Sequence, residues 1–323
     1  MAILVVGSVG YDTVETAAGS RKDALGGSAT FFSVSGSYFA PVGMVAVVGE
    51  DFTTESVDLL KAHEVDVSGL QRAPGKTFRW SGVYGRDDVN SRETLDTQLN
   101  VFADFDPRLS PDHRSLPYLF LANIDPELQL NVLGQMEERP KLVAADTMNF
   151  WIDGKMEALN EVVRSVDVLF VDENEIRQLA AAHVGAVNVV RAARFIQNMG
   201  PETVIVKRGD HGLIQFMGDS IFAAPAYPLD TVVDPTGAGD SFAGGFVGYL
   251  AATGDLGPEA FRRAAVVGSV MGSFAVESFS VERLGALKQT DIAARFRDFG
   301  NISQFAPLQS NETLPWRDGA AAL

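Results

Sequence analysis

The segment with the clearest chemical potential runs from residue 234 to residue 242 and has the sequence Asp-Pro-Thr-Gly-Ala-Gly-Asp-Ser-Phe. Residues 229–233 before it favour an extended strand, and the apolar residues after it recur at helical spacing, which predicts a turn that opens into a helix. The first N–H groups of a helix have no partner within the helix, and together with the helix dipole they attract an anion. Gly237 and Gly239 would let a phosphate approach the backbone closely.

Asp240 falls in the first turn of the predicted helix, where the helix dipole stabilises a carboxylate. Beside an anion-binding turn, such a carboxylate is suited to take a proton from an alcohol while that alcohol attacks a phosphate. The N–H groups of Gly237, Ala238 and Gly239 would then stabilise the charge on the transferred group. In a purely structural alternative, Asp240 only caps the helix and the glycines only form a tight turn, which would suffice to explain a shorter motif.

The elements that must position this segment have the pattern of an α/β protein, because short apolar segments alternate with helical ones. Apolar strands separated by helices indicate a mainly parallel sheet with helices on both faces, a three-layer α/β/α sandwich. The predicted strands are residues 3–6, 42–48, 118–122, 142–145, 168–171 and 204–207, and the predicted helices are residues 29–39, 53–63, 127–136, 156–163, 173–182 and 189–199.

One region breaks this alternation. Residues 77–84 and 94–103 interleave polar and apolar side chains around a turn-rich stretch, which predicts a β-hairpin, and residues 11–16 form a further extended piece. We expect these pieces to form a small β lid, although a hairpin on the sheet edge without function is the alternative. The predicted lid is residues 11–17 and 76–104, and the predicted large domain is residues 1–10, 18–75 and 105–323.

Composition limits the class of function. The chain has 42 acidic and 26 basic side chains and a net charge of −16, which disfavours nucleic acid and anionic membranes as partners. Cysteine is absent, so a disulfide framework and a thiolate nucleophile are excluded, and the four histidines are far apart in the sequence. The apolar start is short and lacks a basic leader, so we expect a cytoplasmic location. The tail after Phe305 is expected to be loosely ordered.

The full string of residues 234–242 resembles the C-terminal signature of the ribokinase-like (PfkB) carbohydrate kinases, which includes Asp-Thr-x-Gly-Ala-Gly-Asp. The resemblance implies that Gly237–Gly239 form the anion hole and that Asp240 is the catalytic base. It also implies ATP as donor, Mg²⁺, and an activating K⁺ held near Asp234 and Thr236. A sugar or nucleoside would be the acceptor, and the resemblance suggests a homodimer formed through the lid edges.

Further segments look like the acceptor site of the same family. Residues 5–12 are similar to its first strand, which ends in an aspartate that binds sugar hydroxyls, here Asp12. Residues 25–29 are similar to its Gly-Gly motif, here Gly26 and Gly27, where the backbone lies against the substrate. A solvated carboxylate and an ordinary strand-to-helix turn are the structural alternatives.

Two segments resemble the family's metal and nucleotide sites. Residues 172–175 look like its Asn-x-x-Glu motif, which positions magnesium and its waters, with Asp172 where asparagine is usual and Glu175 matching. Mg²⁺ prefers oxygen ligands and keeps several waters, so both carboxylates could act through water. Acidic residues that favour a helix N-terminus would also explain this segment. Two strand-end elements of the family are also matched. Asp146 and Asn149 match the element on the substrate side. Lys207, Gly209 and Gly212 match the element on the nucleotide side. Lys207 could face phosphate or simply be solvated.

Phe31 departs from the family pattern. Ribose and fructose kinases usually place an asparagine five positions after the first glycine of the Gly-Gly motif, where it bonds a sugar hydroxyl. An aromatic ring cannot make that bond, but it can pack on a sugar face or stack on a base. Alternatively, Phe31 belongs to the core with Phe32. The departure argues against ribose or fructose and favours a nucleoside or a modified sugar.

The sequence therefore predicts an ATP-dependent kinase that phosphorylates a hydroxyl group of a sugar or sugar-like molecule. The acceptor would be held under the lid by Asp12, Gly27 and Asn100. A nucleoside kinase of the same fold is the alternative within this class. A non-catalytic sugar or nucleotide sensor is the alternative outside it, although such a protein would not need Asp240 beside an intact anion-binding loop.

Overall fold

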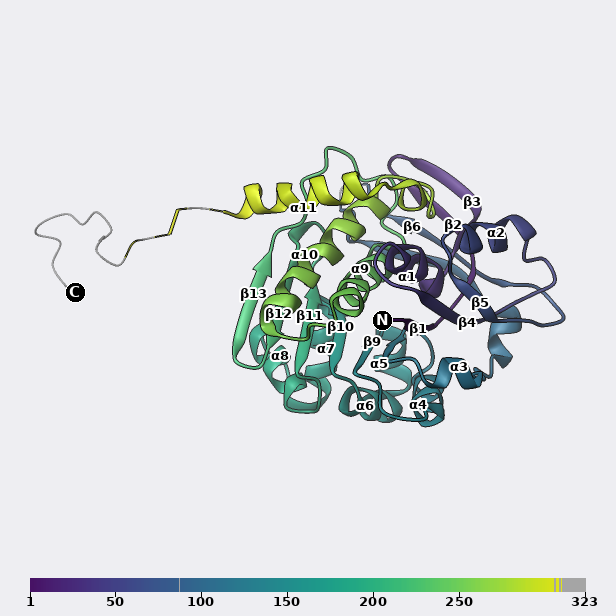
Figure 1. Ribbon diagram of the computed structural model, residues 1–323, viewed down its shortest axis with the longest axis horizontal. Coiled ribbons are helices and arrows are strands. Elements are labelled where there is room, and N and C mark those ends of the chain that lie inside the picture. Colours follow the sequence, from purple (N-terminus) through teal and green to yellow (C-terminus); the bar gives the residue numbers. More distant parts are fainter. Residues whose placement is uncertain (87, 305, 308, 310–323) are drawn as a thin grey trace, which may run out of the picture.

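A nine-stranded sheet forms the centre of the computed structural model, which describes residues 1–86, 88–304, 306–307 and 309 (Figure 1). The expectation for the tail after Phe305 therefore falls almost entirely outside the described residues. The strand order is β13-β12-β11-β10-β9-β8-β1-β4-β5, with β11 to β5 parallel and β12 and β13 antiparallel. The strands are β1 (Ile3–Val6), β4 (Val42–Val48), β5 (Asp66–Arg72), β8 (Tyr118–Leu121), β9 (Leu142–Asp146), β10 (Val168–Asp172), β11 (Thr203–Lys207), β12 (Leu213–Met217) and β13 (Ser220–Ala224).

Each predicted strand of the large sheet is confirmed to within one residue at either end. Strands β5, β12 and β13 were not predicted. The alternation of side chains along β1 shows why the sheet is covered twice, since Ile3 and Val5 belong to one hydrophobic core while Leu4 and Val6 belong to the other.

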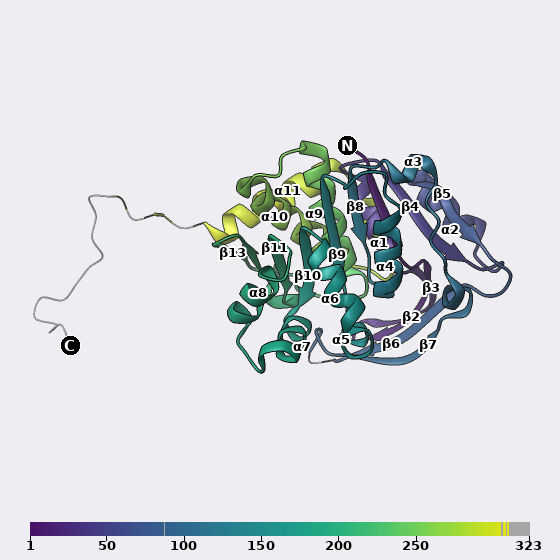
Figure 2. The ribbon, with the colours of Figure 1, turned by 90° about the horizontal axis from the view of Figure 1, so that it is seen from below.

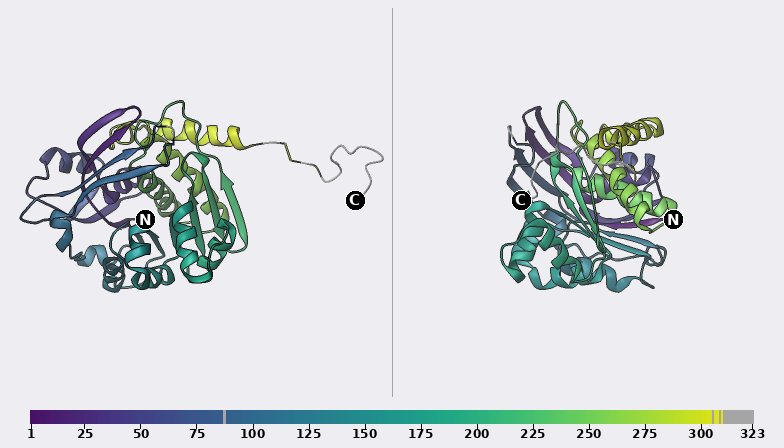
Figure 3. Two further views of the ribbon diagram at one scale, coloured as in Figure 1. Left: turned by 180° about the vertical axis from the view of Figure 1, so that it is seen from behind. Right: turned by 90° about the vertical axis from the view of Figure 1, so that its left-hand side faces the viewer.

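Helices cover both faces of the sheet, which confirms the three-layer sandwich. In Figure 3, the green and yellow helices α9, α10 and α11 lie on one side and the teal helices on the other. The six predicted helices are confirmed as α1 (Ser28–Ser37), α2 (Thr54–Ala62), α4 (Pro126–Gln135), α6 (Met156–Ser165), α7 (Glu173–Val184) and α8 (Val189–Gln197). The other helices are α3 (Pro111–Arg114), α5 (Asn149–Gly154), α9 (Ala238–Thr253), α10 (Pro258–Ala275), α11 (Gln289–Ser303) and the 3-10 turns η1 (Asn100–Asp104), η2 (Gly209–His211) and η3 (Leu284–Ala286).

None of these helices, in the part of the chain that is described, is by itself long and apolar enough to cross a membrane. Helices α7 and α8 reach the required length and apolarity only when counted together, and they are bent by 67° at their junction. Their apolar sides pack on the large sheet, where Ile176, Leu179 and Ile196 are fully buried.

A separate four-stranded sheet, with the order β3-β2-β6-β7, forms the small β lid (Figure 2). Strand β2 runs parallel to β6, and the other pairs are antiparallel. The predicted hairpin and extended piece thus join in one sheet, and its strands are β2 (Gly10–Thr16), β3 (Gly19–Gly26), β6 (Phe78–Tyr84) and β7 (Arg92–Gln98). The sheet also takes in β3, whose residues sequence analysis placed in the large domain. Residues expected to extend the hairpin to position 103 form η1 instead.

Because β2 follows β1 along the chain, the small sheet rises from the edge of the large sheet at which the parallel strands end. That edge is where ligands bind in open α/β sheets. The division of the chain into two domains with fixed boundaries stays a prediction.

Candidate active site

The loop before α9 has the predicted form of a turn that opens into a helix. Gly237 is the residue before the helix and has left-handed φ and ψ angles of 74° and 2°. A side chain here would be strained, and its Cβ would lie 2.3 Å from the ring of Phe31 on α1. Residues 229–233, expected to be a strand, are unpaired with either sheet, although the Val233 N–H donates to the Val276 carbonyl at 2.8 Å.

The backbone N–H groups of Gly237 and Gly239 have no protein partner among the described residues. These two donors are therefore available to an anion at the start of α9. The third predicted donor, Ala238, differs, because its N–H already donates to the Pro235 carbonyl at 3.2 Å as the turn closes on itself. Of the three N–H donors predicted from the sequence, those of Gly237 and Gly239 are thus free and that of Ala238 is not.

Asp240 lies in the first turn of α9 and is only partly exposed. Burial and the negative charge of Asp146 raise the pKa of Asp240 to about 7, while Lys207 opposes the shift. A carboxylate with a pKa close to neutrality is well suited to accept a proton from an alcohol. The predicted base is thus placed beside the free N–H groups with the acid strength that the role requires.

Lys207, at the end of β11, forms an ion pair with Asp146 at the end of β9, with 2.7 Å between Nζ and Oδ2. A Cβ on Gly239 would lie 3.2 Å from the same ammonium group, so Lys207 stands beside the loop. Burial lowers the pKa of Lys207, but the carboxylates of Asp146 and Glu175 outweigh burial and raise it. The lysine is therefore held charged at the edge of the anion-binding loop, whereas Asn149 lies exposed in the first turn of α5.

Asp172 and Glu175 form a capping box at the start of α7. The Asp172 Oδ1 accepts the N–H groups of Asn174 and Glu175, each at 2.7 Å, and the Glu175 Oε2 accepts the Asp172 N–H at 2.6 Å. Both carboxylates therefore stabilise the N-terminus of α7, as the structural alternative for this segment predicted. Burial also raises the pKa of Glu175 to about 8, against the opposing charge of Lys207.

These carboxylates fit a hydrated magnesium ion better than a directly ligated one. No group of three or more His, Cys, Asp or Glu side chains within the described ranges could enclose a metal. A buried carboxylate with a raised pKa would gain from a nearby cation, and oxygen groups suit Mg²⁺ with its waters. A role for Glu175 and Asp172 in holding Mg²⁺ through water stays a prediction.

Asp12 lies on β2 and is 6% exposed, directly beside the Gly-Gly motif. A Cβ on Gly26 would lie 1.9 Å from the Asp12 Oδ2, and one on Gly27, whose φ is +94°, would lie 2.5 Å from the Ser8 carbonyl oxygen. Burial and then the charges of Asp234 and Asp240 raise the pKa of Asp12 to about 7. The charge of the predicted base thus acts on the predicted acceptor aspartate, so the two carboxyl groups lie in one electrostatic environment.

Thr236 and Asp234 connect the loop to the lid. The Asp234 Oδ1 accepts the Thr236 N–H at 2.9 Å, and the Thr236 hydroxyl donates to the hydroxyl of Tyr84 on β6 at 3.2 Å. Burial raises the pKa of Asp234. Tyr84 was not singled out from the sequence, because nothing in its surroundings there distinguishes it from other residues of the hairpin. The predicted K⁺ near Asp234 and Thr236 stays a prediction.

Other predicted site residues have mainly structural contacts. Phe31 is 1% exposed and belongs to the core against Gly237, so its ring is not available to a sugar or a base in this conformation. The Asn100 side chain donates to the Thr77 carbonyl at 2.9 Å and anchors η1 to the lid. Gly209 and Gly212 have positive φ angles of 56° and 84° in the turn after β11, and an added Cβ on Gly212 would lie 2.1 Å from the Ala224 carbonyl oxygen.

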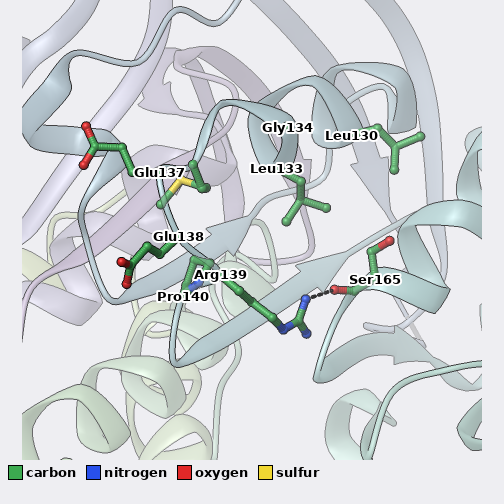
Figure 4. Close-up of a pocket in the computed structure, with 9 residues that line it drawn as sticks. Leu130, Leu133, Gly134, Glu137, Glu138, Arg139, Pro140 and Ser165 are labelled. Atoms are coloured by element: carbon green, nitrogen blue, oxygen red, sulfur yellow. Dashed lines mark hydrogen bonds between the residues drawn. The ribbon is translucent and has the colours of Figure 1, made fainter.

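A shallow surface pocket lies elsewhere on the molecule, between the ends of α4 and α6 (Figure 4). It is lined by Leu130, Leu133 and Arg139 among others, and the Arg139 guanidinium donates to the Ser165 carbonyl at 3.0 Å. Its residues precede β9 and β10, so the pocket is at the edge where the parallel strands begin. It is thus at the opposite end of the sheet from the carboxylates described above.

Asp12 gives a pH-dependent stability that can be measured without substrate. Its pKa of about 7 in the folded chain exceeds the ordinary value of 3.8, so the folded state binds more protons. The stabilisation is complete below about pH 4 and is lost as pH rises through 7. Asp12→Asn is therefore expected to raise Tm at pH 8 by a few degrees, at roughly 2–4 °C per kcal/mol, and to raise it clearly less at pH 5, where only part of the loss has occurred. Thermal unfolding at both pH values measures this, with the exposed Asp58→Asn as control. An equal shift at both pH values would contradict it.

The large sheet with its lid, the glycine turn and the facing carboxylates together define a phosphotransferase with an alcohol group as acceptor, built on the ribokinase fold. A model of the family described as "pfkB family carbohydrate kinase" matches residues 3–280. The chain belongs to the pfkB family of carbohydrate kinases.

The proteins to which the chain is similar include both nucleoside kinases and sugar kinases. The chain is 32% identical over 255 residues to a cytidine kinase of Thermococcus kodakarensis, covering 76% of this chain and 88% of that one. A nucleoside kinase of Burkholderia thailandensis, solved with inosine, superposes with a TM-score of 0.74 at 18% identity, over 92% of this chain and 97% of that one. A putative ribokinase of E. coli, solved with ATP and Mg²⁺, superposes with a TM-score of 0.71 at 19% identity, over 92% and 99%.

Proposed function

We propose that this kinase transfers the γ-phosphoryl group of ATP to a hydroxyl group of a nucleoside, with a pyrimidine nucleoside such as cytidine as the preferred acceptor. The sequence motifs by themselves favoured a sugar or sugar-like acceptor over a nucleoside. The 32% identity to a cytidine kinase across 88% of that protein supports the second reading. The observation that carries the phosphotransfer itself is the placement of Asp240 beside the free N–H groups of Gly237 and Gly239.

The chain's own residues divide the reaction between them. The Asp12 carboxylate accepts neighbouring hydroxyl groups of the acceptor, next to the side-chain-free backbone of Gly26 and Gly27. This orients the reacting hydroxyl toward Asp240, which takes its proton as the oxygen attacks phosphorus. The N–H groups of Gly237 and Gly239 stabilise the charge on the transferred group.

Lys207 and the acidic residues of α7 act on the donor side. The Lys207 ammonium, beside Gly239, is placed to face a phosphate while Asp146 holds it. Glu175 and Asp172 would hold Mg²⁺ through water. When bound, the ion neutralises phosphate charge and fixes the position of the phosphate oxygens.

A panel of acceptors tests the proposal. ADP release is measured with ATP, Mg²⁺ and each of cytidine, uridine, adenosine and inosine, and in parallel with ribose, deoxyribose, fructose and myo-inositol. The expected result is a kcat/KM for the best nucleoside at least about tenfold above that of any sugar, a difference of about 1.4 kcal/mol in transition-state binding. A sugar as best acceptor would overturn the nucleoside proposal and restore the first prediction from the sequence.

A further inference from the structure

Arg92 on lid strand β7 lies on the face of the lid that contacts the anion-binding loop. In the register of the small sheet, Arg92 is opposite Tyr84, and residues that face each other across two strands project from the same side. The Tyr84 hydroxyl accepts a hydrogen bond from Thr236 at 3.2 Å, so this side faces the loop before α9. Asp12 and Trp80 are also opposite each other, on β2 and β6.

The Arg92 guanidinium is held in place by the lid itself. Its carbon atom Cζ lies 5.6 Å from the centre of the Trp80 ring, within the range of a cation–π interaction. The ring is fixed in turn, because its Nε1 donates to the Thr94 hydroxyl at 3.3 Å and because it lies over Gly82, where a Cβ would be 2.3 Å away. The arginine is therefore oriented before any substrate binds.

The charge of Arg92 faces the reacting groups without being neutralised by them. It lowers the pKa of both Asp12 and Asp240, against the larger effect of burial. No ion pair joins Arg92 to another residue in the described part of the chain, although arginines elsewhere in the lid, such as Arg79, are paired. Lys207, which lies beside Gly239, also lowers the pKa of Asp240. Two cations thus act on the predicted base, Arg92 from the small sheet and Lys207 from the large one.

The tip of the lid hairpin touches the turn η2, which follows β11 in the large sheet. The Asn90 side chain donates from Nδ2 to the Asp210 Oδ1 at 2.7 Å, and the Asp210 N–H donates back to the Asn90 Oδ1 at 3.4 Å. Gly209 leaves room for this contact, because a Cβ there would be 1.6 Å from the Asn90 oxygen. Asn90 precedes Arg92 by two residues, so the contact fixes the start of β7 against the turn that follows Lys207.

We propose that Arg92 is a catalytic residue supplied by the lid, which binds the phosphoryl group during transfer, and that Asn90 positions it by docking the hairpin on Asp210. The inference deepens the proposed function and rests on its phosphotransfer step. In that step the bond from the acceptor oxygen to the γ-phosphorus forms while the bond from that phosphorus to the β–γ bridging oxygen breaks. The acceptor's proton goes to Asp240, ADP leaves with the electron pair, and Arg92 and Lys207 both stabilise the charge of the moving group.

Arginine variants test the first part, with the best acceptor of the panel, nucleoside or sugar. Arg92→Ala is expected to lower kcat by about 10²–10³-fold with the acceptor KM within about threefold, and Arg92→Lys to recover part of the loss. Arg86→Ala removes the same charge from the exposed hairpin turn and is expected to leave kcat unchanged. An Arg92→Ala variant with unchanged kcat and a raised KM would overturn the proposal, because Arg92 would then bind the acceptor in its ground state.

A binding measurement keeps this test separate from the choice of acceptor. Calorimetry with ADP, Mg²⁺ and aluminium fluoride, a mimic of the transferred phosphoryl group, is expected to give tighter ADP binding in the wild type than in Arg92→Ala. Binding of ADP alone should be the same in both. Equal tightening by fluoride in both proteins would overturn the role of Arg92 even where the panel supports a nucleoside. A failed panel with fluoride tightening that depends on Arg92 would overturn only the acceptor.

A double-mutant cycle tests the positioning role of Asn90. Asn90→Ala is expected to lower kcat about tenfold in the wild type and to have almost no effect in the Arg92→Ala background, because its effect passes through Arg92. Asp210→Ala should behave in the same way. Effects that multiply in the double variant would show that Asn90 acts independently of Arg92 and would overturn the positioning role.

Discussion

Replacing Asp240 with asparagine is expected to lower kcat by about 10²–10⁴-fold and to leave acceptor affinity within about threefold. The amide keeps the shape of the side chain but cannot take the proton, whereas Asp12 and the Gly-Gly motif, the proposed acceptor ligands, are unchanged. The wild-type kcat/KM should rise with pH through about 7, the pKa of Asp240, and this rise should be absent in the variant. Steady-state kinetics across pH 5.5–9 and acceptor binding by calorimetry measure these effects.

Asp240→Asn is expected to lower activity but to raise the stability of the fold. Because burial raises the pKa of Asp240, the ionised carboxylate destabilises the fold above pH 7, and asparagine removes this cost. Asp240→Asn should therefore melt at a higher temperature than the wild type at pH 8. The exposed Asp230→Asn, a few residues before the loop, serves as control and should change neither quantity. Unchanged turnover in Asp240→Asn would remove the assigned base.

Sequence patterns were sufficient to predict those parts of the structure in which one local physical signal dominates. The buried strands of the large sheet are continuous apolar runs, and the turn before α9 requires glycines whose spacing is visible in the sequence. Gly237 has the positive φ that such a turn needs, and Asp240 lies in the first helical turn as expected. These features depend on local chemistry, so the order of residues along the chain is enough to predict them.

The parts that were missed depend on pairing between distant strands. An irregularity in β7 opposite Ser81 and Gly82 leaves Leu95 outside the register, and one extra residue in a strand exchanges the two faces of all later positions. The faces of Asp96 and the residues after it could therefore not be predicted from the hairpin sequence, and the face of Arg92 depends on its pairing with Tyr84, which the sequence does not reveal. Likewise, the free backbone at Ala238 was assumed from its position, while its bond to Pro235 depends on how tightly the turn closes.

Replacing Gly237 with alanine is the second change with a large expected effect. A left-handed backbone costs an ordinary residue about 1–2 kcal/mol, and the overlap with the Phe31 ring adds about 1–3 kcal/mol. Because Phe31 is buried, its ring cannot swing away, so the turn must move and displace the N–H groups that are proposed to receive phosphate. We expect a lower Tm and a kcat reduced by about 10²–10³-fold, measured by thermal unfolding and steady-state kinetics.

Gly254 at the other end of α9 provides a matched control. Its φ and ψ of 68° and 5° are nearly those of Gly237, but an added Cβ would meet only the flexible end of Met1. Gly254→Ala should therefore show the backbone cost alone, about 1–2 kcal/mol, with unchanged kcat. Equal losses of stability in both variants would mean that the Phe31 ring does not constrain the turn.

A double variant of Phe31 and Gly237 can show whether Phe31 supports the turn or contacts the substrate. If the ring acts by supporting Gly237, Phe31→Leu should cost about 1–1.5 kcal/mol of stability, leave the acceptor KM nearly unchanged, and partly relieve the defect of Gly237→Ala in the double variant. If the ring instead stacks on a base or a sugar, Phe31→Leu should raise the acceptor KM and offer no relief. Because the ring is 1% exposed and lies against the turn, we expect the first result. Phe31, which stands where related kinases have asparagine, would then support the anion-binding loop through Gly237 and would not contact the acceptor. The choice of acceptor would then depend on residues of the lid.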